Sequence, residues 1–524
     1  MKTLYFGLVV LFATCVKFTV SAQVDSARNP IIFADVPDMS IVRVGNTYYM
    51  SSTTMHMSPG VPVMKSNDLV NWHIVNYAYD TLGNVDALAL NNGKNAYGKG
   101  TWASSIRYHN NTYYISTFSQ TTGKTYVFST KDIEKGLWKV SSFIPSFHDN
   151  SLFFDDDGRI YMIYGNLKLR LVELNADFSG PIAGTDQALI ENASAPSPPN
   201  SGLAEGSQLF KIKDKYYLFN ITWPRGGMRT VVVHRADKIT GPWEGRLALQ
   251  DKGVAQGGLV DTPEGKWFAY LFRDFGAVGR IPYLVPVKWE DGWPILGIDG
   301  KVPDTLDLPA SKDLIPGIIA PDEFNRRKGD RALPLVWQWN HNPDNDLWSV
   351  TMRKGYLRLT TGRIDTVFTA ARNTLTQRTF GPECSGSTSI DISNMKDGDF
   401  AGLALLQRKY GLVGVKVNNG AKSIVMVNAQ SGKPVEVQSV PLTQKTVYLK
   451  AECDFNDRID IGYFYYSLDG KSWISIGSQL KMEYSMPHFM GYRFGLFNYS
   501  SKMPGGFVDF DWFHISDQIT KKKQ

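Results

Sequence analysis

The sequence repeats one pattern five times in its first three hundred residues. The segment SIVRVGNTYYMSS, which begins at Ser40, returns in altered form as SIRYHNNTYYIST, SLFFDDDGRIYMIYG, QLFKIKDKYYLFN and GLVDTPEGKWFAYL. Each copy joins an apolar run to an aromatic-rich run through a tight polar turn such as GN, NN, DG, KD or EG. Two such runs around a short turn are typical of a β-hairpin. We therefore expect five related β units.

The spacing of these copies indicates what the units build. They begin at residues 40, 105, 151, 208 and 258, so successive starts lie 65, 46, 57 and 50 residues apart. A second pattern follows most hairpins, as SNDLVNW, STKDIEKGLW, RADKITGPW and VKWEDGW, while the third unit has only ELNADFSGP. Units of roughly 50 residues with about four strands each are typical of propeller blades. We predict a five-bladed β-propeller over residues 28–310; an irregular β-sandwich with chance hairpins is the alternative.

The repeated pattern ends before Pro321, and the residues beyond it have a different pattern. The runs GYLRLTTG, STSIDIS, LVGVKVNN and VYLKAECDF alternate as strands do, and no helical stretch of note appears anywhere in the chain. We predict a second domain over residues 320–517, a two-sheet β-sandwich or jelly roll. The whole chain is thus expected to be all-β.

The first residues, MKTLYFGLVVLFATCVKFTVSAQ, combine an early lysine, an apolar run and the small residues Ser21 and Ala22. This arrangement is typical of a secretory signal peptide, residues 1–22, with cleavage after Ala22. A membrane-spanning helix is disfavoured because Lys17 interrupts the run, which falls short of the roughly 20 residues needed to cross. We expect an exported protein, in the periplasm, at the cell surface or in the medium.

Charge and cysteine content exclude some partners and leave one question open. The formal charge is +6, and two of the positive charges lie in the leader. No basic run is longer than Lys521–Lys523, so the sequence predicts no nucleic-acid partner. After cleavage only Cys384 and Cys453 remain, and an export compartment permits a disulfide between them without requiring one. The oligomeric state also stays open.

Acidic residues recur where the first strand of a unit begins. Asp38 precedes SIV, Asp149 precedes NSLFF and Glu205 precedes GSQLF, whereas the second unit has Ser104 there and the fifth has Gln256. A propeller gathers the first strand of every blade around one axis, so these acids are expected to meet at its mouth. Each acid alone is more typical of a turn, but a charge facing this ring is costly to desolvate without a partner or a function.

Glycosidic bond cleavage is one use for such a trio. It takes a carboxylic acid that protonates the leaving oxygen and a carboxylate, which in an inverting enzyme activates water on the opposite face of the sugar. A third acid nearby can adjust the pKa of the proton donor. An aromatic content of 13% also suits surfaces that bind sugar rings.

The motifs PDMSIVRVGNTYY, HDNSLFFDDDGRIY, AEGSQLFKIKDKYYL, GGLVDTPEGKW and FGAVGRIPYLVPVKWEDGWP resemble glycoside hydrolase family 43, the β-xylosidase and α-L-arabinofuranosidase family. The segments LPLVWQWNHNPDNDLWSV and FAGLALLQRKYGLVGV resemble the concanavalin A-like, lectin-like sandwich of its β-xylosidase branch. The resemblance covers nearly all of the mature chain. It implies an inverting mechanism on a five-bladed propeller.

The resemblance also implies roles for individual residues. Asp38 would be the general base, Glu205 the general acid, and Asp149 the residue that tunes the pKa of the donor and orients it. Arg280, in GAVGRIP, matches an arginine that grips sugar hydroxyls, and Trp102, in TWAS, stands where relatives place an aromatic wall.

Four further features of the sequence bear on the pocket. His148, beside Asp149, would touch substrate or line the pocket, and Trp223 would be a sugar platform or a packing residue. Gln256 replaces a histidine that supports a central metal in relatives, so no cofactor is expected to be required and a structural calcium is left as an option. In some relatives the sandwich adds a side chain to the propeller's pocket, but the sequence does not indicate which one.

These observations predict an exo-acting glycosidase that removes terminal β-D-xylose from xylo-oligosaccharides or xylan. Release of α-L-arabinofuranose from arabinoxylan or arabinan is the close alternative, since the two pentoses present similar hydroxyl patterns. A carbohydrate-binding surface protein without catalysis is the alternative of a different class. The loss of one of the three acids would favour that reading, and all three are present.

Overall fold

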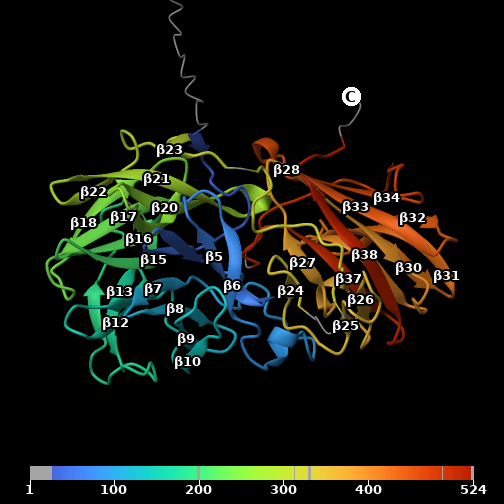
Figure 1. The fold of residues 1–524 in the computed structure, drawn as a ribbon, viewed down its shortest axis with the longest axis horizontal. Coiled ribbons are helices and arrows are strands. Elements are labelled where there is room, and N and C mark those ends of the chain that lie inside the picture. The colour runs from blue at the N-terminus through green and yellow to red at the C-terminus, as the bar shows by residue number, and fades with distance from the viewer. Residues whose placement is uncertain (1–25, 198–200, 312, 328–331, 487, 521–524) are drawn as a thin grey trace, which may run out of the picture.

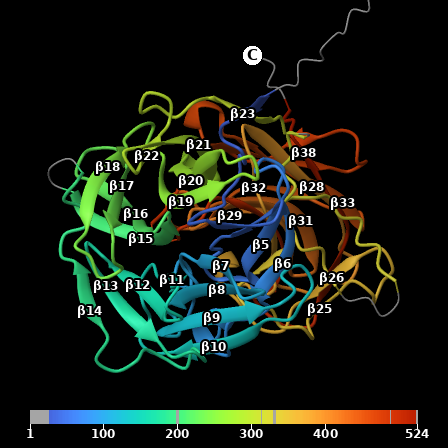
Figure 2. The same cartoon turned by 60° about the vertical axis from the view of Figure 1, so that its left-hand side comes forward.

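Five four-stranded antiparallel sheets follow one another along the first three hundred residues of the computed structural model and surround a common centre (Figures 1 and 2). The structure describes residues 26–197, 201–311, 313–327, 332–486 and 488–520. The predicted signal peptide, residues 1–22, lies outside these ranges. The predicted five-bladed propeller is confirmed.

Each blade runs in chain order from its inner to its outer strand. Blade 1 consists of β2 (Ser40–Val44), β3 (Thr47–Ser51), β5 (Gly60–Ser66) and β6 (His73–Tyr79), and blade 2 of β7 (Ser105–His109), β8 (Thr112–Ser119), β9 (Lys124–Thr130) and β10 (Lys139–Phe143). Blade 3 consists of β11 (Ser151–Phe154), β12 (Ile160–Asn166), β13 (Lys168–Leu174) and β14 (Gln187–Ile190), and blade 4 of β15 (Ser201–Ile212), β16 (Lys215–Pro224), β17 (Thr230–Ala236) and β18 (Glu244–Leu249). Blade 5 consists of β19 (Ala255–Asp261), β20 (Trp267–Asp274), β21 (Arg280–Glu290) and β22 (Trp293–Leu296).

The five repeated hairpins are the first two strands of each blade. The second repeated pattern connects the third strand to the fourth, as SNDLVNW does between β5 and β6. The inner strands β2, β7, β11, β15 and β19 contact one another in this order, and β19 returns to β2, which closes the ring. Strand β1 (Ser26–Arg28) pairs with β23 (Thr305–Pro309) beyond the last blade.

Serine hydroxyls join neighbouring inner strands. The serine at the first position of an inner strand accepts a backbone N–H from the next blade: Ser40 from Ile106 at 3.2 Å, Ser105 from Leu152 at 3.3 Å, and Ser151 from Leu209 at 3.0 Å. The same repeated position thus satisfies a backbone donor where one sheet meets the next.

The second domain is a sandwich of two eight-stranded sheets, as predicted (right-hand side of Figure 1). One sheet contains β32 (Val435–Pro441), β31 (Ala421–Asn428), β30 (Gly411–Asn418), β29 (Asp399–Leu406), β37 (Arg493–Ser500), β27 (Leu375–Arg378), β24 (Gln338–Asn340) and β4 (Met57–Ser58). The other contains β25 (Trp348–Ser349), β26 (Leu357–Thr360), β38 (Phe507–Ser516), β28 (Glu383–Asp391), β33 (Thr446–Asp454), β34 (Ile461–Ser467) and β35 (Ile474–Ser475), with β36 (Leu480–Lys481) beside β34.

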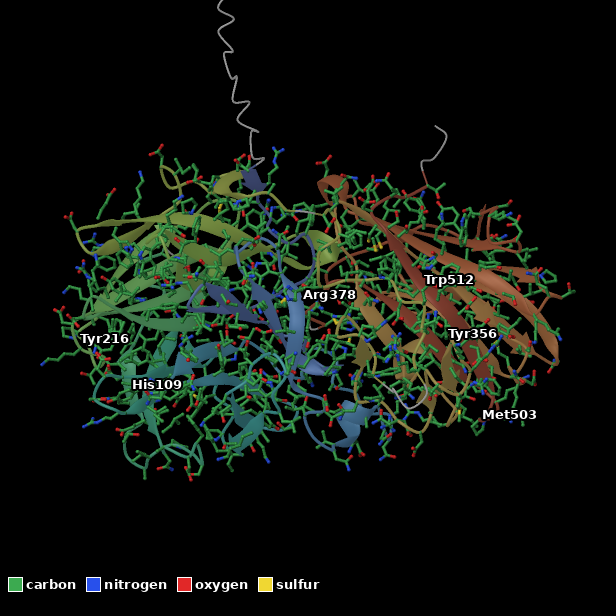
Figure 3. All side chains as sticks on the ribbon, viewed as in Figure 1. His109, Tyr216, Tyr356, Arg378, Met503 and Trp512 are labelled. Carbon is green, nitrogen blue, oxygen red and sulfur yellow. The ribbon has the colours of Figure 1, made fainter. Side chains whose placement is uncertain are left out.

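Strand β4 belongs to the propeller by sequence and to the sandwich by pairing. It lies in the loop between β3 and β5 of blade 1, yet Ser58 and Met57 pair with Trp339 and Asn340 of β24. Arg378 of β27, which Figure 3 places between the two domains, is fully buried and donates from Nε to the carbonyl of Asp35 at 2.9 Å. The two domains therefore share both a sheet and buried polar contacts.

Helical structure is minor throughout the described residues. It consists of the 3₁₀ turns η1 (Asp86–Ala89), η2 (Gly276–Val278), η3 (Phe368–Ala370) and η4 (Asn456–Arg458). In the described part of the chain, no helix has the length and apolarity that a membrane crossing needs. Cys384 of β28 and Cys453 of β33 are buried free thiols that stand directly opposite each other in register.

Candidate active site

The chain enters its inner strands through an unusual backbone conformation. Asp38 and Asp149, two positions before β2 and β11, have φ values of 50° and 47°. Gly206 and Gln256 lie at register shifts within β15 and β19 and have φ values of 66° and 56°. Left-handed φ values are uncommon for residues with a side chain, although Asp tolerates them better than most. The repeated local geometry therefore presents the side chains of three blades to the same central space.

Blade 4 differs because glycine takes this position and its acid comes one residue earlier. A Cβ on Gly206 would lie 2.6 Å from Cγ of Gln256, so the crowding leaves room only for glycine. Glu205 is displaced from the crowded centre, and 18% of its side chain is exposed. The acid best placed to meet an incoming molecule is therefore Glu205.

Asp38 is a buried carboxylate held by an arginine. Its Oδ1 accepts a hydrogen bond from Nη1 of Arg280 at 2.8 Å, and both side chains are 7% exposed. Burial raises the pKa of Asp38, whereas the positive charges of Arg280 and Arg229 lower it. Because Arg280 fixes one oxygen of this carboxylate, the rest of the group keeps acceptor capacity for a water molecule.

His148 joins the other two acids. Its Nε2 lies 2.9 Å from Oε2 of Glu205 and 3.7 Å from Oδ2 of Asp149. The same Oδ2 of Asp149 accepts the backbone N–H of Gly206 at 3.0 Å, which ties blade 3 to blade 4. The imidazole of His148 therefore lies between the carboxylates of Asp149 and Glu205 and contacts both.

The close packing of these groups shifts their proton affinities. Burial, with repulsion from Glu205 and Asp38, raises the pKa of Asp149 to about 7 despite the opposing effect of His148. Burial lowers the pKa of His148, but the negative charges of Asp149 and Glu205 outweigh it and raise the value to about 9. His148 and Asp149 thus both have raised pKa values beside the carboxylate of Glu205.

Aromatic side chains from both domains lie around His148, Asp149 and Glu205. The ring of Trp102 lies 5.9 Å from His148 and 5.1 Å from Phe489 of the sandwich. Phe489 also lies 6.0 Å from the guanidinium of Arg280, and Tyr484 of the sandwich lies at the same distance from it. The sandwich therefore contributes side chains to the propeller's site, and Phe489 is the one that stands closest to the predicted aromatic wall.

A small cavity lies among residues of all five blades, including Asp38, Ala103, Asp149, Ser207 and Gln256. Its volume is about 10 Å³, close to what one water molecule needs. Oδ1 of Asn150 lines it and is buried with no hydrogen-bond partner among the described residues. This room suits one water better than a calcium ion, which takes six to eight oxygens and brings waters of its own.

Among the described residues, one group of His, Cys, Asp or Glu side chains is close enough to share a metal ion. It is the trio His148, Asp149 and Glu205, whose candidate ligand atoms lie within 4.8 Å of one another. The hydrogen bond between His148 and Glu205 already joins two of these atoms.

Family models match both domains. Residues 27–294 match the model described as "Glycosyl hydrolases family 43". Residues 322–516 match "Beta xylosidase C-terminal Concanavalin A-like domain".

The chain belongs to glycoside hydrolase family 43.

Relatives of this family 43 glycosidase carry both expected activities in their names. A "Beta-xylosidase" of Formosa agariphila is 29% identical and aligns over 93% of this chain and 89% of its own. A "Non-reducing end alpha-L-arabinofuranosidase" of Bacteroides ovatus is 27% identical over 65% of this chain and 66% of its own. A solved structure from Bacteroides eggerthii, described as "Bifunctional GH43-CE", is 68% identical with a TM-score of 0.93 over 95% of this chain; the present chain spans 64% of its length.

Some residues of the family 43 site were not indicated by the sequence motifs. Phe489 and Tyr484 come from the sandwich, and the family resemblance indicated that this domain can add a side chain to the pocket without indicating which one. Arg229 and Asp274 lie beside Arg280, where they form an ion pair of 2.5 Å. For Arg229 a signal did exist, because it occupies the same place in blade 4 that Arg280 occupies in blade 5.

Proposed function

We propose that the protein is an exo-acting, inverting family 43 glycosidase that releases terminal β-D-xylose from xylo-oligosaccharides or xylan. In this proposal Asp38 is the general base that activates water, and Glu205 is the general acid that protonates the leaving oxygen. Asp149 and His148 hold Glu205 in place and govern its proton supply. Arg280 orients Asp38 and binds hydroxyl groups of the sugar, while Trp102 and Phe489 pack against the sugar ring.

One observation carries this proposal: acids from three separate blades converge at one mouth, with different partners. Asp38 has a guanidinium, which favours its ionised form. Asp149 and Glu205 instead both contact the imidazole of His148, and burial raises the pKa of Asp149. Carboxylates in contrasting environments are the arrangement that acid–base hydrolysis of a glycoside needs.

Release of α-L-arabinofuranose is the second candidate, because relatives named for xylosidase and for arabinofuranosidase activity both match this chain. The two candidates are separated by assaying p-nitrophenyl β-D-xyloside and p-nitrophenyl α-L-arabinofuranoside side by side. We expect the xyloside to have the larger kcat/KM. A larger value for the arabinoside would reverse the ranking.

The inverting course has its own test. Inversion requires space for a water molecule between base and sugar, and it leaves the released xylose in the α configuration. Proton NMR of the first product, recorded before mutarotation, should show the α anomer. The β anomer would show that Asp38 acts as a nucleophile.

Glu205→Gln separates catalysis from binding. The amide cannot donate the proton, so we expect turnover of xylobiose to fall by about two to four orders of magnitude while binding is retained. Calorimetric titration with xylobiose measures the binding. If the unaltered protein releases no pentose from any oligomer and the variant binds equally well, the protein is a carbohydrate-binding surface protein and the proposed hydrolysis is wrong.

The reaction as proposed uses protons and water and requires no metal. Prolonged dialysis against EDTA should therefore leave kcat for the xyloside unchanged. A structural calcium near the central cavity is the alternative, and a loss of both activity and thermal stability that calcium restores would establish it.

We also propose that the chain is exported, because its first 22 residues are typical of a secretory signal peptide. Cell fractionation with a periplasmic marker and mass spectrometry of the N-terminus test this. We expect a mature protein that begins at Gln23.

A further inference from the structure

We propose that Arg229 is a positioning residue for the general base: by engaging Asp274, it keeps Arg280 on Asp38. This inference rests on the proposed function, in which Asp38 activates water. It deepens that function by naming a residue outside the predicted site that acts on the base.

The propeller repeat itself places Arg229 beside Arg280. In blade 5, Asp274 pairs with Arg280 at the loop end of β20 and β21. In blade 4 the last pair is Thr222 with Thr230, and the next positions outward are Trp223 and Arg229. Both positions are joined by connections of the same length, residues 224–228 and 275–279. Two arginines therefore stand at matched positions in neighbouring blades.

Arg229 is held firmly at this place. Its Nη2 lies 2.5 Å from Oδ2 of Asp274, and its guanidinium lies 3.7 Å from the centre of the Trp223 ring. Only 11% of the side chain is exposed. Stacking on an aromatic face together with a short ion pair restrains the guanidinium from two sides. The same stacking covers one face of Trp223, which argues against that face as a sugar platform.

Asp274 forms ion pairs with two arginines, a short one with Arg229 and a longer one with Arg280. Its Oδ1 is 3.5 Å from Nε of Arg280, too far for a good hydrogen bond. Both atoms are buried, and neither has a hydrogen-bond partner among the residues that the structure describes. Arg280 instead donates from Nη1 to Asp38 at 2.8 Å.

Two carboxylates thus contact the same guanidinium, Asp38 at Nη1 of Arg280 and Asp274, at a longer distance, at Nε. While Arg229 occupies Asp274, the shortest charged contact of Arg280 is the one with Asp38. Without Arg229, Arg280 would be the remaining cation beside Asp274, whose side chain is 39% exposed. A small rotation of Arg280 would close the gap of 3.5 Å and shorten this ion pair. Arg280 would then be drawn away from the general base.

The charges around Asp38 fix the direction of the effect on pH dependence. Arg280 and Arg229 lower the pKa of Asp38, whereas Asp274 and Glu205 raise it. The remaining titratable groups that face it are His148, Asp149 and Tyr484. Since Asp38 must be ionised to act as a base, kcat/KM falls as the pH drops through its pKa.

The experiment compares pH profiles of kcat/KM for the pentoside that the unaltered protein hydrolyses faster. We expect Arg229→Met to move the acidic limb upward by about one pH unit and to lower kcat/KM about tenfold at pH 6. Asp274→Asn should move the same limb downward, because it removes a negative charge and leaves Arg280 wholly to Asp38. Arg229→Lys should restore part of the loss. Arg225→Met, an exposed arginine of the same loop, is the matched control and should leave the profile unchanged.

The opposite signs distinguish positioning from a merely structural role. Both Arg229→Met and Asp274→Asn break the same ion pair, so a role in folding alone would affect them alike. Shifts in one direction, or no shift, overturn the inference. If Arg229→Met fails to fold, as judged by its melting temperature, Asp274→Asn decides on its own: an unmoved or raised limb overturns the inference. Asp38→Asn is measured in the same series. If it retains activity, or if the unaltered protein hydrolyses neither pentoside, the proposed function itself is wrong and the inference fails with it.

Discussion

Asp35 and Asp38 lie three residues apart, and their surroundings give them different tasks. Asp35 accepts the backbone N–H groups of Arg280 at 2.8 Å and of Gly491 in the sandwich at 3.0 Å. Asp38 accepts a guanidinium and faces the site. Both are acids within two residues of Pro37 in one loop, and nothing in that loop distinguishes them. The first joins the two domains, and the second is the residue that we propose as general base.

Asp149 should reduce stability at alkaline pH. Its pKa of about 7 in the folded protein exceeds the value of about 4 expected for an unfolded chain. A raised carboxyl pKa contributes stability below pH 4 that is lost as the pH rises through 7. We therefore expect the free energy of unfolding of Asp149→Asn, relative to the unaltered protein, to increase by on the order of 2 kcal/mol between pH 5 and pH 8.

Urea denaturation at both pH values measures this difference. Asp214→Asn is the control, because Asp214 also has a left-handed φ of 61° but lies in an exposed turn. Asp149→Asn should have lower activity than the unaltered protein but a higher free energy of unfolding at pH 8. Such a trade-off between activity and stability is expected of a functional site. Equal pH dependence in both variants would contradict the raised pKa.

The acids of the site could be picked out from sequence because Asp38 and Asp149 sit at the same point of a local repeat and Glu205 lies one residue from it. Arg280 and Trp102 followed from family motifs. Phe489 could not be predicted, since its approach depends on how two domains dock. Arg229 could have been predicted by aligning the third strands of blades 4 and 5, but its chemistry depends on Asp274 in the neighbouring blade.

At the scale of the elements, the propeller is joined through the starts of its inner strands. Ser151 of β11 accepts Nη2 of Arg107 at 2.9 Å as well as the N–H of Leu209. Ser151→Ala would leave the buried N–H of Leu209 unpaired and remove the shortest hydrogen bond of Arg107 Nη2, which keeps longer ones to Gln208 and Leu209. We expect a loss of about 2 kcal/mol in the free energy of unfolding.

Thermal or urea unfolding measures this loss, with Ser142→Ala as control. Ser142 lies exposed on β10, away from the ring of inner strands. A loss below about 0.5 kcal/mol for Ser151→Ala, equal to that of the control, would show that the ring does not depend on this contact.

The repeated hairpins were predictable because a hairpin is specified by neighbouring residues. β2 with β3 and β19 with β20 both follow from alternation around a short turn. Strand β4 was not predictable, since its two residues pair with β24, some 280 residues further along the chain. Short strands that depend on distant partners carry almost no local signal.

At the scale of the whole molecule, the two domains form a joint structure. A strand of blade 1 extends a sheet of the sandwich, and Asp35 and Arg378 are buried between them. Interfaces between independent domains are usually more polar and rely less on shared sheets. We expect a single calorimetric unfolding transition whose calorimetric and van't Hoff enthalpies agree. Two separate transitions would show that the propeller and the sandwich unfold independently.

The pairing of β4 with β24 limits how such enzymes can be recombined. A chimaera that exchanges sandwiches at the linker would bring a foreign β24 against the native Met57 and Ser58, and a foreign loop against Trp102. Functional exchange would require the crossover to carry residues 54–60 along with the C-terminal half. Evolution by shuffling is thus constrained to move a discontinuous unit, and loops of blade 1 should change in step with the sandwich that they complete.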